Sequence, residues 1–192
     1  MQPLFTIHAG EYLVGSHIEQ HLRDPNGDKV NVWVPSKDTG IDLLVTDKTN
    51  KKTTSLQVKF SKDFLLTHGR PEYRDKLVSC GWWTLNREKI RESSADYWVF
   101  VLHTHDKKDM QYVILTPQQL LERLEAIRPD VESGMSYIWV TKDNGAGQQC
   151  WETRGLNKAE TDALVLGDGR IAPERDFSGF LNDWGAIFGE WE

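Results

Sequence analysis

The chain has few cysteines and no long apolar run. Only two of its 192 residues are cysteine, Cys80 and Cys150, and they lie far apart without the spacing of a metal site. This scarcity argues against a disulfide framework and favours a reducing compartment, the cytoplasm. No run of 18 apolar residues occurs, which excludes a transmembrane helix, and the N-terminal residues lack the basic and apolar segments of a secretory signal.

Motifs of several enzyme classes are also missing. The sequence contains no G-x-S-x-G, no P-loop and no G-x-G-x-x-G, so acyl transfer and nucleotide-cofactor chemistry find no support. His17 and His21 have the spacing of a zinc pair on a helix but not the H-E-x-x-H pattern. His103 and His105 have no cysteine or acidic partner at ligand spacing. We interpret both pairs as structural or surface histidines.

Positive charge is not in surplus. The chain has 23 basic and 29 acidic residues and a formal net charge of −6, whereas nucleic-acid-binding proteins usually carry a basic footprint. Basic residues nevertheless cluster within residues 47–62 and 68–76, and such local patches make the contacts to phosphates. The net charge therefore does not exclude a nucleic-acid partner. The alternative is that these lysines only make a turn soluble.

Helical and strand patterns alternate along the chain and predict one α/β domain with a mixed central β-sheet flanked by helices. Val14, Ile18 and Leu22 recur at helical spacing and indicate a helix over residues 6–22. Three strands should follow, over residues 30–34, 40–46 and 55–61. Beyond them we expect helices over 81–93, 116–127 and 176–191, and strands over 96–103, 111–116, 135–141 and 148–154.

Polar residues interrupt two of these apolar strands. Asp42 lies within "GIDLLVT", and Gln57 and Lys59 lie within "SLQVKFS". Burying such groups costs several kcal/mol each unless they are paired or used. Because side chains alternate along a strand, Gln57 and Lys59 share one face, and an antiparallel register with Asp42 opposite either of them would gather all three. Glu11 on the apolar stripe of the first helix would add a second acid, and Gly15 would let that helix approach the sheet.

Carboxylate and amide oxygens are ligands for a hard divalent cation such as Mg²⁺. A lysine beside them could orient an attacking water and stabilise a negatively charged transition state. Other interpretations remain open. Asp42 could be a structural acid, Gln57 and Lys59 could face water at a sheet edge, and Glu11 could be an exposed acid favoured by the helix dipole.

The combined pattern resembles the PD-(D/E)XK nuclease superfamily. Its residues here are Glu11 in "GEYLVGS", Asp42 in "DTGIDLLV", and Gln57 and Lys59 in "QVK". The resemblance implies a restriction endonuclease-like core with the order α-β-β-β-α-β over about residues 6–115. An α/β extension over about residues 116–192 would complete a single domain of residues 1–192.

The resemblance also implies a function, a Mg²⁺-dependent endonuclease that hydrolyses phosphodiester bonds in DNA, with Mn²⁺ as a possible substitute, in restriction or phage defence. Glu11, Asp42 and Gln57 would bind the metal and Lys59 would act in catalysis. A homodimer would cut both strands. The residues expected to hold phosphates are Lys51, Lys52, Lys62, Arg70 and Arg74.

One departure from the family pattern matters. The family usually has a carboxylate where this chain has Gln57, and an amide oxygen is the weaker ligand. The alternative is therefore a catalytically inactive module on the same fold that binds nucleic acid or a protein. A third interpretation, an antitoxin-like or immunity partner, would suit the acidic second half of the chain.

Overall fold

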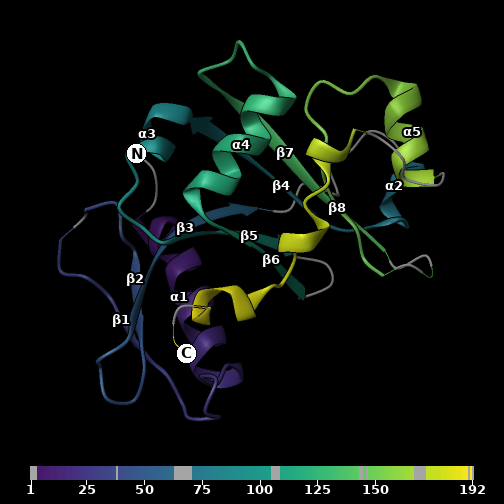
Figure 1. The fold of residues 1–192 in the computed structure, drawn as a ribbon. Helices are drawn as coiled ribbons and strands as arrows, with labels where there is room; N and C mark the ends of the chain where they lie inside the picture. The colour runs from purple at the N-terminus through teal and green to yellow at the C-terminus, as the bar shows by residue number, and fades with distance from the viewer. Residues whose placement is uncertain are drawn as a thin grey trace.

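The computed structural model describes residues 4–37, 39–62, 71–104, 109–142, 145, 147–166, 172–189 and 191. It contains a central five-stranded sheet and a second, three-stranded sheet (Figure 1). The first half of the chain forms α1 (Leu4–His21), β1 (Asn31–Trp33), β2 (Leu43–Thr46), β3 (Thr53–Lys62), α2 (Pro71–Arg74), β4 (Leu77–Asn86), α3 (Arg87–Arg91) and β5 (Tyr97–Thr104). The second half forms β6 (Asp109–Leu115), α4 (Pro117–Ile127), β7 (Ser133–Thr141), β8 (Cys150–Glu152), α5 (Lys158–Leu166) and three 3-10 turns, η2 (Pro173–Arg175), η3 (Ser178–Phe180) and η4 (Trp184–Phe188).

The central sheet is mixed, as predicted. Its strand order is β1-β2-β3-β5-β6, in which the first three strands are antiparallel, β5 runs parallel to β3, and β6 is antiparallel to β5. Val14 and Ile18 of α1 pack with Leu43 and Val58 on one face. On the other face α4 packs against β5 and β6. Helices therefore cover both faces of the sheet.

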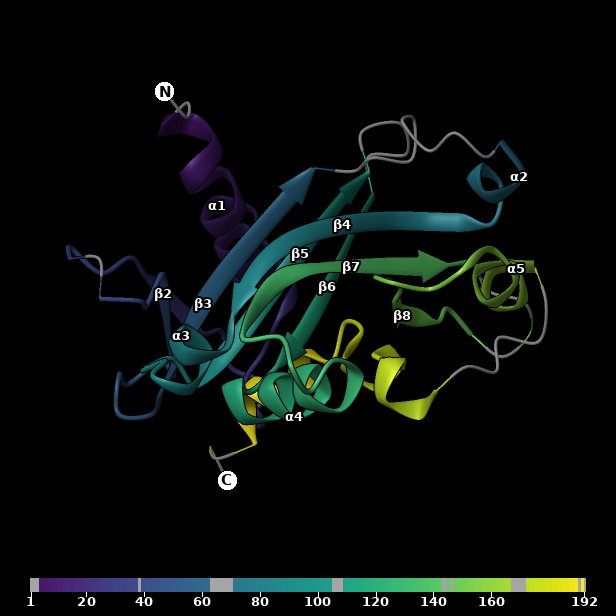
Figure 2. The same cartoon turned by 90° about the horizontal axis from the view of Figure 1, so that it is seen from above.

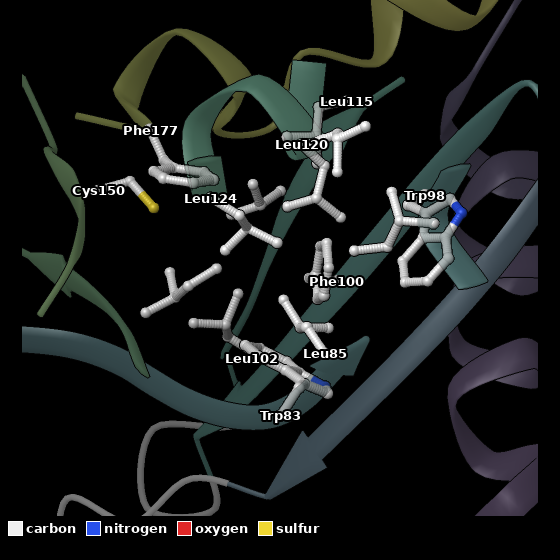
Figure 3. Close-up of a cluster of buried hydrophobic side chains, with 14 of the residues drawn as sticks. Trp83, Leu85, Trp98, Phe100, Leu102, Leu115, Leu120, Leu124, Cys150 and Phe177 are labelled. Carbon is white, nitrogen blue, oxygen red and sulfur yellow. The ribbon is translucent and has the colours of Figure 1, made fainter. Parts of the chain in front are cut away.

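The core is divided by β5, which is buried on both sides. Val99 and Val101 face α1, whereas Trp98, Phe100 and Leu102 face α4, and none of the five is more than 4% exposed. Figure 3 shows Trp98, Phe100 and Leu102 meeting the leucines of α4 and Trp83 of β4. This burial on two faces explains the unbroken apolar sequence of the strand.

The fourth helix has the predicted start. Thr116 accepts a hydrogen bond from the amide of Gln119 (3.1 Å), and the Gln119 side chain accepts one from the Thr116 amide (2.8 Å), which together form a capping box. Pro117 occupies the first turn, as the sequence indicates. Within the described ranges, no helix has the length and apolar character needed to cross a membrane.

The prediction of a helix over residues 81–93 is largely wrong. Most of this segment belongs to β4, in which buried Gly81, Trp83 and Leu85 alternate with exposed Trp82 and Thr84. Such alternation is the period of a strand, and aromatic residues favour strands. Helix α3 begins only at Arg87, where the Asn86 side chain accepts the Lys89 amide (3.0 Å) and ends the strand.

Strand β4 does not join the central sheet. It lies against β3 and β5, and it pairs with β7, which in turn pairs with β8 (Figure 2). The strands predicted over 135–141 and 148–154 therefore exist but form a second sheet with β4. Strand β4 and the short helices α2 and α3 lie between β3 and β5, where the order α-β-β-β-α-β has one helix.

The prediction of an amphipathic helix over residues 176–191 is also wrong. The segment forms short 3-10 turns, and Asn182 adopts a positive φ of 55° that interrupts helical geometry. Asn182 instead binds the backbone of β6, with its amide 2.6 Å from the Tyr112 carbonyl and its side chain accepting the Tyr112 amide at 2.9 Å. Glycines at 179, 185 and 189 lower the helical propensity further. Helix α5 was not expected from the sequence.

Candidate functional site

The first helix approaches β3 most closely at Gly10. A Cβ atom on Gly10 would lie 2.6 Å from Phe60 Cβ and 3.2 Å from a methyl group of Val58. A Cβ on Gly15 would lie 3.5 Å from Val32, an ordinary contact. The sequence predicted Gly15 as the point of approach, which is wrong, because Gly10 takes that place. Gly10 thereby sets the distance of Glu11, its neighbour in the helix, from the sheet.

Asp42 lies at the end of the paired segment of β2 and β3, directly before Leu43. Strand β2 begins at Leu43, which pairs with Leu56, and one further step in this register sets Asp42 opposite Gln57. The Asp42 amide donates to the Leu56 carbonyl (2.8 Å), and the Val58 amide donates to Asp42 Oδ2 (2.6 Å). The carboxylate therefore lies against β3 at the residue between Gln57 and Lys59.

Gln57 and Lys59 lie on the face of β3 turned away from α1. Their neighbours Leu56 and Val58 pack in the cluster that contains α1, whereas Lys59 Nζ lies 5.0 Å from the ring centre of Trp98 on the opposite face. Both polar side chains are half-buried. Among the residues that the structure describes, none hydrogen-bonds the side-chain amide of Gln57.

Glu11 is paired with a histidine that precedes it by one helical turn. His8 Nδ1 and Glu11 Oε2 are 3.0 Å apart, and the Glu11 side chain is 16% exposed. The hydrogen bond to Glu11 and the charge of its carboxylate raise the pKa of His8, and the charge of Asp42 acts in the same direction. Glu11 itself lies on the α1 side of the sheet, in the wall of a groove.

A groove of about 520 Å³ runs between α1 and the first strands. Of the four candidate residues, Glu11 is the one that lines it, together with His8, Tyr12, Val34 and Leu43, the residue after Asp42. Gln57 and Lys59 face the other side of β3. The structure thus places Asp42 beside Gln57 and Lys59 on β3, whereas Glu11 lines the groove on the α1 side of the sheet.

The Asp42 carboxylate and the Gln57 amide offer oxygen donors at this point. Carboxylate and amide oxygens suit a hard cation, and Mg²⁺ usually keeps several waters when a protein supplies few ligands. In the part of the chain that the structure describes, no group of three or more His, Cys, Asp or Glu side chains is arranged to hold a metal ion. Of the three ligands expected from the sequence, Asp42 and Gln57 lie opposite each other, whereas Glu11 is on the α1 side of the sheet.

The basic residues expected to hold phosphates are not gathered at this point. Lys51 and Lys52 border a separate hollow of about 360 Å³ at the start of β3. Lys52 is five residues from Gln57, or roughly 16 Å along an extended strand. Arg70 lies outside the described residues, as do the side chains of Lys62 and Arg74.

Sequence reasoning missed three parts of the site. His8 could have been noticed from its i, i+3 spacing to Glu11. The amide of Val58 carries no sequence signal. Trp98 contacts Lys59 only because β3 pairs in parallel with β5.

Comparisons of the chain with protein-family models, with curated proteins and with solved structures found no match.

Proposed function

We propose that the protein is a metal-dependent phosphodiesterase that cleaves nucleic acid, most directly DNA. The observation that carries this proposal is the hydrogen bond from the Val58 amide to the Asp42 carboxylate, which holds an acid between Gln57 and Lys59. The order and directions of the central strands support the restriction endonuclease-like core that the sequence pattern implies.

The metal-binding residues in this proposal are Asp42, Gln57 and Glu11. A bound Mg²⁺ would supply an activated water and would offset negative charge that develops on the phosphate. Asp42 is fixed by its bond to Val58, so its carboxylate is oriented before any ligand binds. Such preorganisation is what a site on rigid strands contributes.

Lys59 is the proposed positioning group for the water and the phosphate. Its ammonium lies over the face of Trp98, which restricts the flexible side chain and keeps the charge at the buried face of β3. There it would orient the attacking water and stabilise the transition state by its charge.

A cleavage screen tests the proposal. Wild type should cut at least one of duplex DNA, single-stranded DNA, branched DNA or RNA with Mg²⁺ or Mn²⁺. Lys59→Met keeps the aliphatic stem over Trp98 but removes the charge, and it should lose most of the rate, roughly 100-fold or more. If wild type leaves all four substrates intact with either metal, the proposal is wrong.

A second candidate is an inactive module that binds nucleic acid or a protein. The observation that favours it is the short ligand set, since Glu11 is engaged by His8 and an amide stands at position 57. This candidate predicts that the protein binds a nucleic acid or protein partner and that neither wild type nor Lys59→Met cleaves nucleic acid.

A further inference from the structure

The outermost strands of the two sheets differ in what covers their edges. Strand β6 is hydrogen-bonded along its outer edge to Asn182, and β8 to Phe177 and Ser178. The Trp82 amide of β4 donates to the Ser61 hydroxyl. Strand β1 ends the central sheet on its other side (Figure 1), and among the described residues only β2 pairs with it. This edge is therefore available to a further strand.

The backbone of Val32 in β1 points away from the sheet. The Asp47 amide donates to the Lys52 carbonyl (3.1 Å), so the even-numbered residues of β2 turn their backbone groups toward β1. Those residues pair with Asn31 and Trp33, which leaves the amide and carbonyl of Val32 turned outward. Of the residues that the structure describes, none hydrogen-bonds either group. An outward amide and carbonyl on one residue match the backbone of an extended polypeptide.

The groove of about 520 Å³ between α1 and the first strands adjoins this edge. Val32, Val34 and Leu43 line it from the strands, and Tyr12 and Gly15 line it from the helix. Val34 is 68% exposed and Tyr12 is 74% exposed, so the groove has apolar side chains in contact with water. A residue paired with Val32 would lie on the same face of the sheet as the Val32 side chain. A strand added to β1 would therefore direct alternate side chains into the groove.

The helix side of the groove carries two acids. Glu11 is paired with His8 (3.0 Å), whereas Glu19 is exposed and forms no ion pair with any residue in the described part of the chain. Glu19 follows Gly15 by about one helical turn, roughly 6 Å along α1. Two residues of an extended strand span roughly 7 Å. A basic side chain two positions from the residue paired with Val32 would therefore reach Glu19.

We propose that this groove binds an extended peptide that adds to β1 as a strand and carries a lysine or arginine two positions from an apolar residue. The peptide backbone would donate to the Val32 carbonyl and accept from the Val32 amide. Its apolar side chain would pack on Val32 and Leu43, and its cation would pair with Glu19. In this mode the main-chain bonds give affinity and the groove gives specificity. The inference does not depend on the proposed phosphodiesterase activity.

Charge favours a basic peptide over a second copy of the chain. Pairing of β1 with the same strand of another copy would be isologous, so the acidic groove walls of two identical α1 helices would face each other. Like charges brought together in this way oppose association, whereas a basic peptide is attracted. Pro35, two residues after β1, also limits how far two such strands could pair.

Selection of random heptapeptides displayed on phage against the full chain in EDTA tests the inference, with the Kd of each selected peptide then measured by fluorescence anisotropy. Selected sequences should share a lysine or arginine two positions from an apolar residue. Glu19→Lys should raise the Kd at least roughly fivefold, because it replaces an attraction by a repulsion. Glu88→Lys reverses an exposed acid on α3, outside the groove, and should leave the Kd unchanged.

A second pair of variants tests the strand addition. Val32→Pro removes the outward amide, which proline can do on an edge strand without loss of a sheet hydrogen bond. It should raise the Kd roughly 2- to 10-fold, the effect of one hydrogen bond. Val32→Thr keeps the amide and the branched shape, so it should bind the selected peptides more tightly than Val32→Pro does. Exchange of the Val32 amide with solvent, followed by NMR, should slow when a selected peptide is bound.

Three results would overturn the inference. The first is a selection that enriches no sequence or enriches sequences without a basic residue, and the second is an equal Kd for wild type and folded Glu19→Lys. The third is a wild-type dimer in sedimentation that Val32→Pro dissociates, which would assign the edge to a second copy. Thermal unfolding establishes that each variant is folded. Because binding is measured in EDTA, this inference and the proposed function fail separately.

Discussion

At the scale of single residues, Asp42 uses its carboxylate in two ways. One oxygen accepts the Val58 amide, a structural role that any acid at a strand end could fill. The same bond fixes the carboxylate beside Gln57 and Lys59, where a ligand for a cation would have to be. A structural and a functional role are therefore compatible at this position, and only a substitution that keeps the hydrogen bond can separate them.

His8 leads to a prediction about pH. Its raised pKa means that the imidazolium holds Glu11 at and somewhat above pH 6.5, and a metal that uses Glu11 must displace this partner. Metal affinity of wild type should therefore increase as pH rises through the His8 pKa. His8→Ala should bind Mn²⁺ more tightly at pH 6, by up to roughly fivefold, and should show a flatter pH profile.

Calorimetric titrations with Mn²⁺ between pH 6 and pH 8 measure this effect. His21→Ala, which removes an exposed histidine at the other end of α1, should behave as wild type. An identical pH profile for wild type and His8→Ala would show that Glu11 takes no part in metal binding.

At the scale of elements, the contact between α1 and β3 controls the position of Glu11. Gly10→Ala places a methyl group 2.6 Å from Phe60 Cβ, so the helix must shift, and we expect a loss of about 1–3 kcal/mol in the free energy of unfolding. The methyl group of Gly15→Ala makes only an ordinary contact, and the substitution removes a flexible residue from the helix. The free energy of unfolding should therefore increase by up to about 1 kcal/mol.

Urea denaturation of the two alanine variants compares these contacts directly. The pair differs in location and not in chemistry, which makes each variant the control for the other. Equal stability of Gly10→Ala and Gly15→Ala would contradict the close approach of α1 at Gly10.

The buried acid of β8 joins several elements of the second half. Glu152 is fully buried and binds Arg128 at the end of α4, Arg175 of η2 and the hydroxyl of Ser136 in β7. Glu152→Ala would leave two cations without their partner, and we expect it to cost about 3–5 kcal/mol of stability.

Arg91→Ala provides the comparison, because it breaks ion pairs with Glu125 and Glu132 that lie at the surface. Such pairs contribute about 0–1 kcal/mol, so this variant should unfold near the wild-type midpoint. A Glu152→Ala variant as stable as Arg91→Ala would show that the small sheet does not depend on the buried acid.

At the scale of the whole molecule, the sequence was informative where the pattern was local. The strands of the central sheet follow from apolar alternation and turn residues, and the α4 start follows from Thr116 and Pro117. The 81–93 segment was misread because Trp82, Leu85 and Ile90 also fit helical spacing. Whether Trp82 or Trp83 is buried depends on β7, which is about fifty residues away in the chain.

The candidate site, like the fold, could be predicted from sequence only where the pattern is local. Asp42, Gln57 and Lys59 could be selected from sequence because polar residues interrupt apolar strands. The arrangement of these side chains could not be predicted from sequence, since it depends on where β2 stops pairing with β3 and on the hydrogen bond to Val58. The second sheet was unpredictable for a related reason, because strand pairing between β4 and β7 leaves no trace in local periodicity.

The central claim is that Asp42 anchors a metal beside Gln57 and Lys59, and calorimetric titration of Mn²⁺ into wild type and Asp42→Asn tests it most directly. Asparagine can still accept the Val58 amide, so the variant should fold normally while it loses the charge that a cation requires. We predict one site per chain in wild type and a loss of affinity of roughly 30-fold or more in Asp42→Asn. Equal Mn²⁺ affinity in the two folded proteins, or no binding by wild type, would contradict the account.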